Sequence, residues 1–318
     1  MPAMIDLLQQ SPPVAIAAAT LMGLLIGSFL NVVIYRVPVM LEREWAAQAA
    51  EFANAGAETA RAPATEPAAE PAVEPAATTA ATTTGTPAPD QGAPFNLMVP
   101  RSRCPSCGHE ITALENIPVI SWLVLRGRCS SCATPISIRY PSIELATALL
   151  SGLAIWHLGA TAAGLAALVL TWFLVSLTFI DFDTQLLPDN MTLPLLWLGL
   201  LLNLFGVFAP LHSAVIGAIA GYLTLWTIYW AFKLATGKEG MGYGDFKLLA
   251  ALGAWFGWQA LPGIILLSSV VGAVVGIGLM VLARRGREVP MPFGPYLAGA
   301  GLLTLYFGRP IAAYFGLA

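Results

Sequence analysis

The sequence has very little charge. Charged residues make up 10% of its 318 residues, hydrophobic residues make up 57%, and the mean hydropathy is +0.73. A soluble chain usually carries about 25% charged residues, so this chain has too few to cover a folded surface in water. The composition therefore excludes a soluble globular enzyme. The formal net charge of -3 also gives no reason to expect nucleic acid as a partner.

The sequence contains several long runs of apolar residues. Most are close to the roughly 20 residues that a helix needs to cross about 30 Å of hydrocarbon, although the second and sixth are short. They are apolar on every face and lack the alternation of barrel strands, which favours helices. The sequence thus predicts an all-α polytopic membrane protein with about eight transmembrane helices. Their approximate bounds are 14–35, 143–158, 161–180, 191–209, 213–234, 246–259, 261–282 and 295–315.

Basic residues are few and fall almost entirely on one side of these spans. Fourteen of the fifteen Lys and Arg residues lie after spans one, three, five and seven or at the edge of a span, and only Arg309 lies elsewhere. Because basic loops stay in the cytoplasm, we expect a periplasmic N-terminus. Arg36 and Arg43 follow the first span and no basic residue precedes it, the reverse of a secretory signal, so this span is expected to be a retained anchor.

The expected domain organisation has three parts. Residues 1–37 form the N-terminal anchor, 38–142 a cytoplasmic loop, and 143–318 a membrane domain of seven helices. Inside the loop, residues 38–60 are expected to form a helix near the membrane. Residues 61–94 include ATEPAAEPAVEPAATTAATTTGTPAPDQGAP and have almost no large apolar side chain to bury, which predicts a disordered, semi-extended tether.

Cysteine is also scarce, and its spacing is specific. The four cysteines form two C-x-x-C pairs, Cys104-Pro-Ser-Cys107 and Cys129-Ser-Ser-Cys132. This spacing is typical of zinc ribbons and knuckles, while two disulfides or a redox pair are the alternatives. Disulfides rarely persist in the reducing cytoplasm. We therefore expect a zinc-ribbon-like module over residues 95–140 with structural Zn²⁺, and we expect His109 to be a polar residue of the knuckle.

Acidic residues gather at the expected membrane boundary. Beyond Glu144 the chain has six acids, of which Asp181, Asp183 and Asp189 lie between spans three and four, and Asp245 opens span six. Carboxylates at such positions are costly and usually functional. Two that converge across helices would share a proton as an aspartic dyad does. Asp183 would point away from Asp181 on a helix, so we expect it to face water.

Simpler structural roles compete with the catalytic one. Asp189 and Asp245 each stand where an N-cap is expected, and Lys247 suits an interfacial anchor. Capping does not require Gly242 and Gly244, however. Glycine permits unusual backbone angles and close approach of another chain, which fits an extended peptide beside a carboxylate.

Four motifs, in order, resemble the type IV prepilin leader peptidases. They are the run Gly27-Ser-Phe-Leu-Asn31-Val-Val-Ile-Tyr-Arg36, the paired C-x-x-C motifs, Ile-Asp181-x-Asp-x-x-x-Leu-Pro-Asp, and Gly-Tyr-Gly-Asp245. The resemblance covers nearly the whole chain apart from the tether, which is longer than the family usually carries. It implies a bifunctional bacterial inner-membrane enzyme. Such enzymes cut the leader from prepilins and type II secretion pseudopilins after a glycine, then methylate the new N-terminus with S-adenosylmethionine.

The resemblance also assigns residues. It implies that Asp181 and Asp245 are catalytic, that the four cysteines bind zinc, and that Gly242, Gly244 and Lys247 support the site. One carboxylate would act as general base on water while the other donates a proton. The chain lacks a G-x-G-x-x-G run, so methylation is implied by the resemblance alone and its residues are unassigned.

Two other functions remain as alternatives. A serine or cysteine peptidase ranks low because His109, His157 and His212 are not placed to serve as its base. A proton-coupled transporter would use paired membrane carboxylates as a relay. Transporters tend to place the site at the midplane between repeats, whereas these acids lie at one face. The expected partners are prepilins, pseudopilins and membrane lipid, and the sequence leaves the oligomeric state open.

Overall fold

The computed structural model describes residues 10–60, 95–282 and 292–314. The chain divides into two compact units, Met1–Pro38 with Arg101–Ala318, and Val39–Pro100. The tether expected over residues 61–94 lies outside the described residues. The aspartates, glycines, cysteines and lysine of the expected sites all belong to the first unit.

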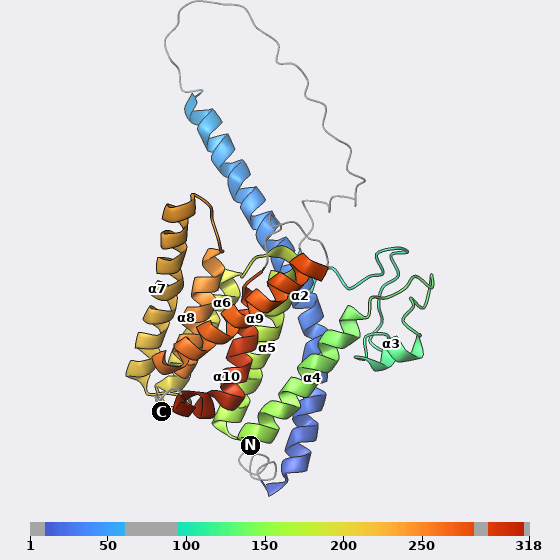
Figure 1. The fold of residues 1–318 in the computed structure, drawn as a ribbon. Coiled ribbons are helices and arrows are strands. Elements are labelled where there is room, and N and C mark those ends of the chain that lie inside the picture. The colour runs from blue at the N-terminus through green and yellow to red at the C-terminus, as the bar shows by residue number, and fades with distance from the viewer. Residues whose placement is uncertain (1–9, 61–94, 283–291, 315–318) are drawn as a thin grey trace, which may run out of the picture. The chain divides into compact units, whose positions relative to one another are not determined.

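Helices occupy all eight expected positions (Figure 1). They are α2 (Pro12–Ala60), α4 (Arg139–Leu158), α5 (Ala162–Thr184), α6 (Asp189–Asn203), α7 (Leu211–Thr236), α8 (Tyr243–Phe256), α9 (Leu261–Leu282) and α10 (Gly294–Tyr314), with a short α3 (Ile120–Val124) and a 3-10 turn η1 (Trp258–Ala260). Within the described ranges there is no strand, only two isolated β-bridges. The all-α fold class is confirmed.

Among the described residues, four helical segments are long and apolar enough to cross a membrane by length and composition. They are Pro12–Ala55, Ala162–Thr184, Leu211–Thr236 and Trp258–Val281. A chain with several such helices is a multi-pass membrane protein. The finding does not extend to all eight helices, so the count of eight spans stays a prediction.

The first helix is longer than expected. The anchor expected over 14–35 and the helix expected over 38–60 are one 49-residue helix, α2, with Pro38 inside it. The residues after Pro38 are mostly Ala, Glu and other good helix formers, which continue the helix once it has started. The boundary expected near residue 37 thus falls inside a helix, at the point where the first segment of the first compact unit ends with Pro38, and the domain division stays a prediction.

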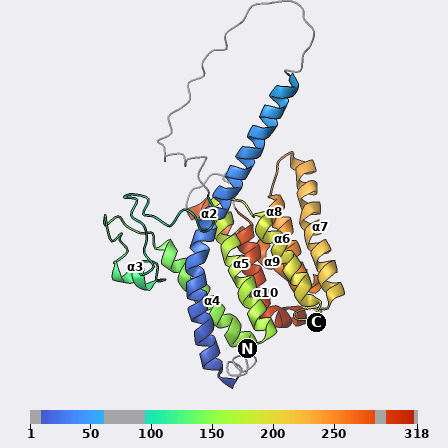
Figure 2. The ribbon, with the colours of Figure 1, turned by 180° about the vertical axis from the view of Figure 1, so that it is seen from behind.

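Helix α8 is buried along most of its length and packs against α6, α7 and α10 (Figure 2). Its side chains Phe246, Leu248, Leu249 and Trp255 are fully buried. The Trp255 indole N–H donates to the Leu195 carbonyl at 2.8 Å, which satisfies the one polar group of a buried ring. Burial of Phe246 near the start and of Trp255 near the end therefore fixes α8 along its length, and its first turn carries Asp245.

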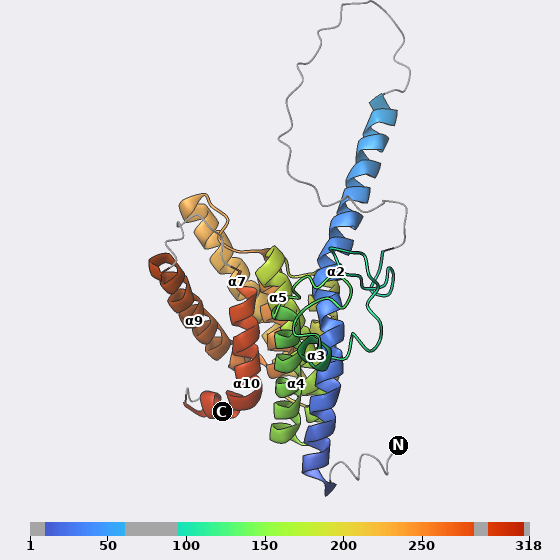
Figure 3. The same cartoon turned by 90° about the vertical axis from the view of Figure 1, so that its right-hand side faces the viewer.

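Helices α4 and α5 form an antiparallel hairpin that brings the start of α4 beside the end of α5. The chain turns at Gly159, whose φ is 71°. Asn31 of α2 donates its side-chain N–H to the Tyr140 carbonyl at 3.2 Å, so this residue of the first motif ties α2 to the start of α4. Helix α10 packs on α5, α8 and α9 (Figure 3). The beginning of α10 consequently reaches the end of α5.

Candidate active site

Asp181 and Asp245 are both buried at one end of the helix bundle. Asp181 lies in the last turn of α5 and is 4% exposed, and Asp245 lies in the first turn of α8 and is 6% exposed. The two carboxyl groups lie close enough for their charges to interact. The helices thus bring together the two acids that the sequence analysis singled out, although 64 positions separate them in the chain.

A third helix contributes a hydrogen bond to this pair. The backbone N–H of Gly294, the first residue of α10, donates to Oδ2 of Asp181 at 2.9 Å. The N-terminus of a helix carries partial positive charge, so this contact favours the ionised form of Asp181. In contrast, Oδ1 of Asp245 is buried and accepts no hydrogen bond from any residue that the structure describes. A buried oxygen without a donor is typical of functional sites.

Leu187 packs closely against two glycines that lie beside the aspartates, Gly244 and Gly294. A Cβ added to Gly244 would lie 2.6 Å from the Leu187 Cβ, and one added to Gly294 would lie 2.6 Å from Oδ2 of Asp181 and 3.2 Å from Cδ1 of Leu187. Real Cβ atoms essentially never approach another heavy atom within 3.0 Å. Glycine is therefore required at both positions by close approach within the protein.

The capping roles considered for Asp189 and Asp245 are wrong. Pro188 is the N-cap of α6 and Gly242 is the N-cap of α8, and neither helix has a side-chain cap hydrogen bond. Asp189 instead binds Nζ of Lys247 with both oxygens, at 2.5 and 2.6 Å. Lys247 consequently links α8 to α6.

Asp183 faces away from the pair, as expected. It forms an ion pair with Arg139 at the start of α4, in which Nη1 donates to Oδ1 at 2.8 Å. The two side chains are 33% and 39% exposed, respectively. Asp183 therefore fastens α5 to α4 at the polar end of the bundle.

The four cysteines form one cluster. Their sulfur atoms all lie within 4.8 Å of one another, and the Sγ atoms of Cys104 and Cys132 are 3.7 Å apart. Four sulfurs placed tetrahedrally at about 2.3 Å from Zn²⁺ would be separated by about 3.8 Å. All four are free thiols. The donor set and its spacing therefore fit one zinc ion and no disulfide.

The two knuckles repeat the same backbone pattern. The N–H of Cys104 donates to His109 O at 2.9 Å, and the N–H of Cys129 donates to Thr134 O at 2.9 Å. Thr134 also hydrogen-bonds the Cys132 thiol, and this lowers the pKa of Cys132 to about 6. A thiolate near neutral pH is the form that binds metal.

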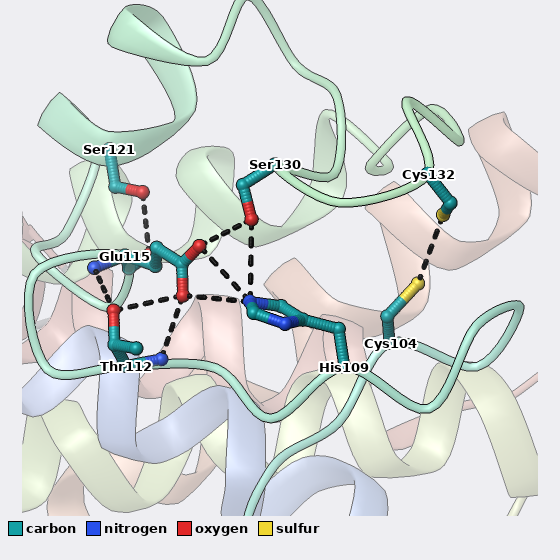
Figure 4. A network of polar contacts seen from close by, with 7 residues as sticks. All are labelled: Cys104, His109, Thr112, Glu115, Ser121, Ser130 and Cys132. Carbon is teal, nitrogen blue, oxygen red and sulfur yellow. Dashed lines mark hydrogen bonds and ion pairs between the residues drawn. The ribbon is translucent and has the colours of Figure 1, made fainter.

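Glu115 joins the two knuckles (Figure 4). Its carboxylate accepts hydrogen bonds from the Thr112 N–H at 2.8 Å, the Thr112 hydroxyl at 2.9 Å and the Ser130 hydroxyl, and lies 3.2 Å from Nε2 of His109. The hydroxyl of Ser130, followed by the groups of Thr112, lowers the pKa of Glu115 to about 2. Glu115 is therefore an ionised acceptor between the first knuckle and the second.

This network is not a serine peptidase triad. Ser130 and Glu115 both approach the same nitrogen, Nε2 of His109, at 3.4 and 3.2 Å. A triad needs the acid on the other ring nitrogen. His109 is also outside the sulfur cluster, consistent with its expected role as a polar knuckle residue.

Sequence reasoning missed three residues of these sites. Gly294 lies in Pro292-Phe-Gly-Pro295 at the start of a span, and this pair of prolines around a glycine is a signal that would have indicated a special backbone. Leu187 lies inside a quoted motif, but nothing in the sequence marks its packing. Glu115 has no local signal, since its partners include residues of the second knuckle.

Two buried carboxyl groups therefore meet at one end of a bundle of helices in a multi-pass membrane protein. Residues 21–158 match the Bacterial Peptidase A24 N-terminal domain, and residues 168–277 match the Type IV leader peptidase family. The chain belongs to the type IV leader peptidase family.

Relatives align with nearly the full length of the chain. A protein of Aeromonas hydrophila is 57% identical over 295 residues, covering 93% of this chain and 91% of the relative. Proteins of Stutzerimonas stutzeri and Pseudomonas aeruginosa are 52% and 51% identical, each covering 97% of this chain and 96% of the relative. All three are named prepilin leader peptidase/N-methyltransferase. No solved structure matches the chain.

Proposed function

We infer that this protein is a prepilin leader peptidase and N-methyltransferase. It cleaves the leader of type IV prepilins and type II secretion pseudopilins after a glycine, as a membrane aspartic endopeptidase, and methylates the new N-terminal residue with S-adenosylmethionine. The buried pair of Asp181 and Asp245 is the observation that carries the peptidase, and the names of the full-length relatives support both activities.

The two carboxyl groups take different roles in the proposed mechanism. Asp181 is the general base, because the Gly294 N–H at the start of α10 stabilises its negative charge. Asp245 is the general acid, because its buried Oδ1 has no hydrogen-bond donor among the described residues and burial favours the protonated form. Asp181 takes a proton from water as the water attacks the scissile carbonyl carbon, while Asp245 donates its proton to the carbonyl oxygen. Asp181 then gives its proton to the amide nitrogen as the C–N bond breaks, and Asp245 takes a proton back from a hydroxyl of the tetrahedral intermediate, which restores both groups. No covalent intermediate with the enzyme forms.

The surrounding contacts keep both acids in position. Gly244 and Gly294 let α8 and α10 approach Leu187 and Asp181 closely, and Gly242 is the N-cap of α8. Lys247 holds the first turns of α8 and α6 together through Asp189. Preorganised groups of this kind keep the reacting atoms within the narrow limits that catalysis requires.

The four-cysteine cluster holds structural Zn²⁺ in this proposal. Cys104, Cys107, Cys129 and Cys132 supply four thiolates, so the metal has no open position for a substrate. Zinc stabilises the fold of the module and takes no part in peptide cleavage. S-adenosylmethionine is the co-substrate of methylation, and no residue is assigned to it.

We place the protein in the bacterial inner membrane with a periplasmic N-terminus. The distribution of Lys and Arg supports this orientation, which puts the aspartate pair at the cytoplasmic face. The proposed parts are an anchor over 1–37, a cytoplasmic loop over 38–142 and a catalytic membrane domain over 143–318.

Incubation of the purified protein with a prepilin and S-adenosylmethionine tests the proposal. Mass measurement should show loss of the leader and gain of one methyl group. A cleaved product without the methyl group would contradict the proposed methyltransferase activity. An intact prepilin would remove the peptidase, and proton flux in proteoliposomes would then favour the transporter.

A further inference from the structure

The short helix α3 exposes large apolar side chains beside the zinc module. Ile120, Leu123 and Val124 are 55%, 61% and 74% exposed, and Leu114 in the preceding loop is 76% exposed. Ile120, Leu123 and Val124 have the i, i+3, i+4 spacing of one helix face, and exposed apolar surface of this kind marks an interaction site. The position of α3 along the helix bundle and the basic residues near it favour a lipid surface as the partner.

A hydrogen bond fixes the depth of α3 along the bundle. The Val119 N–H, just before α3, donates to Oε2 of Glu144 on α4 at 2.7 Å, and Figures 1 and 3 draw α3 beside α4. Glu144 follows Arg139 by five residues, or about 7–8 Å along the helix axis. Arg139 pairs with Asp183 at the polar end of the α4–α5 hairpin. The start of α3 thus lies below that end, towards the membrane interior.

Charge around α3 suits a lipid surface. Residues 95–142 contain five arginines and two glutamates. Arg126 and Arg128, which closely follow α3, have side chains that solvent can reach. Basic side chains near a membrane are attracted to anionic headgroups. An apolar segment with arginines at its edge therefore matches the boundary between headgroups and acyl chains.

We propose that α3 and Leu114 lie in the lipid leaflet on the side of the aspartate pair and anchor the four-cysteine module to it. Interfacial segments bury their apolar face about 5–10 Å into this boundary, which agrees with the depth set by Glu144. Helix α4 is one of the eight spans predicted from the sequence, and its exposed side chains Leu145, Leu149 and Trp156 are expected to face lipid along the same helix. The module is thereby held at a fixed depth beside the membrane helices.

A fluorescent amino acid encoded at Val124 tests this placement. The full-length protein is reconstituted in nanodiscs of phosphatidylcholine and phosphatidylglycerol, with and without bromine on the acyl chains, a short-range quencher. The label at Val124 should lose most of its fluorescence in brominated lipid, as should a label at Leu149 on the exposed face of α4. A label at Lys238, which is exposed in the loop after α7, should keep its fluorescence.

Two further measurements separate lipid from other partners. With both Arg126→Glu and Arg128→Glu, quenching at Val124 should decrease while quenching at Leu149 stays the same. The zinc content of each labelled protein is measured to show that the module is intact. Quenching at Leu149 but not at Val124 would overturn the proposal. So would crosslinking from position 124 to a second copy of the chain or to prepilin in place of lipid.

Discussion

Replacing Asp181 or Asp245 by asparagine is expected to abolish leader cleavage without unfolding the protein. The reaction needs one ionised and one protonated carboxyl group, and an amide can be neither. Cleavage of a prepilin by each purified variant measures this. Asp183→Asn is the matched control and should stay active, because Asp183 pairs with Arg139 at the edge of the bundle. Normal cleavage by the double variant of Asp181 and Asp245 would disprove the aspartic mechanism.

Alanine at Gly244 or Gly294 is expected to impair cleavage through crowding. The new Cβ would meet Leu187 at 2.6 Å in the first case and Oδ2 of Asp181 at 2.6 Å in the second. Either clash displaces one of the two carboxyl groups. Gly299→Ala on α10 is the control, since a Cβ there has no neighbour within 4 Å and alanine favours helix over glycine by about 1 kcal/mol.

Cleavage rate and melting temperature on the same samples decide this second prediction. Gly244→Ala and Gly294→Ala should lose rate, whereas Gly299→Ala should keep it and melt no lower than the parent protein. A fully active and more stable Gly244→Ala protein would show that the close approach to Leu187 is not needed.

At the scale of the element, Glu115→Gln is expected to loosen the contact between the two knuckles. Glutamine keeps the shape but loses the charge that Thr112, Ser130 and His109 surround. Residues that hydrogen-bond a metal ligand directly contribute about 10- to 100-fold to metal affinity, and Glu115 contacts residues beside the cysteines instead, so a loss of at most about 10-fold is expected. Competition with a chelator measures the change in zinc affinity.

Glu110→Gln is the control for this variant. Glu110 pairs with Arg103 in the same loop, but both side chains are about half exposed, at 48% and 56%. Such surface pairs contribute little, so zinc affinity should stay close to that of the parent protein. Equal losses in the two variants would mean that Glu115 has no special role.

The helices and the paired knuckles follow largely from the sequence, because they depend on local patterns. Apolar runs predict the eight helices, and cysteine spacing predicts the cluster. The end of α2 was not predictable in the same way, since Pro38 stops many helices and here lies inside one. The hydrogen-bond donor to Asp181 could not be predicted from the sequence either. Gly294 is 113 positions away in the chain, and only the packing of α10 on α5 brings the two residues together.

At the scale of the whole molecule, the segment over residues 61–94 is expected to be dispensable for cleavage. Its composition has too few apolar side chains to form a core. Loop-closure free energy changes by only about 0.6 kcal/mol for each doubling of length, so a shorter connection should be tolerated. Deletion of residues 62–92 followed by a cleavage assay measures this. An inactive protein that still inserts into the membrane would show that the segment binds something.

One zinc ion per chain is expected, bound by the four cysteines. Structural zinc supplies folding free energy to the region it joins, so Cys104→Ser should loosen residues 95–140 and lower activity while Asp181 and Asp245 remain in place. Metal analysis and hydrogen exchange on the purified protein measure both effects. Unchanged zinc in a variant that lacks all four cysteines would contradict the assignment.

Leu187 packs closely against Gly244 and Gly294, which lie beside the two aspartates, and this packing resists compression. The ion pairs of Arg139 with Asp183 and of Lys247 with Asp189 are partly exposed, and salt screens such charges over about 8 Å at 0.15 M. Repulsion between touching atoms does not depend on salt. Ions can therefore loosen the rim of the bundle while the packing of Leu187 against Gly244 and Gly294, beside the two aspartates, stays the same.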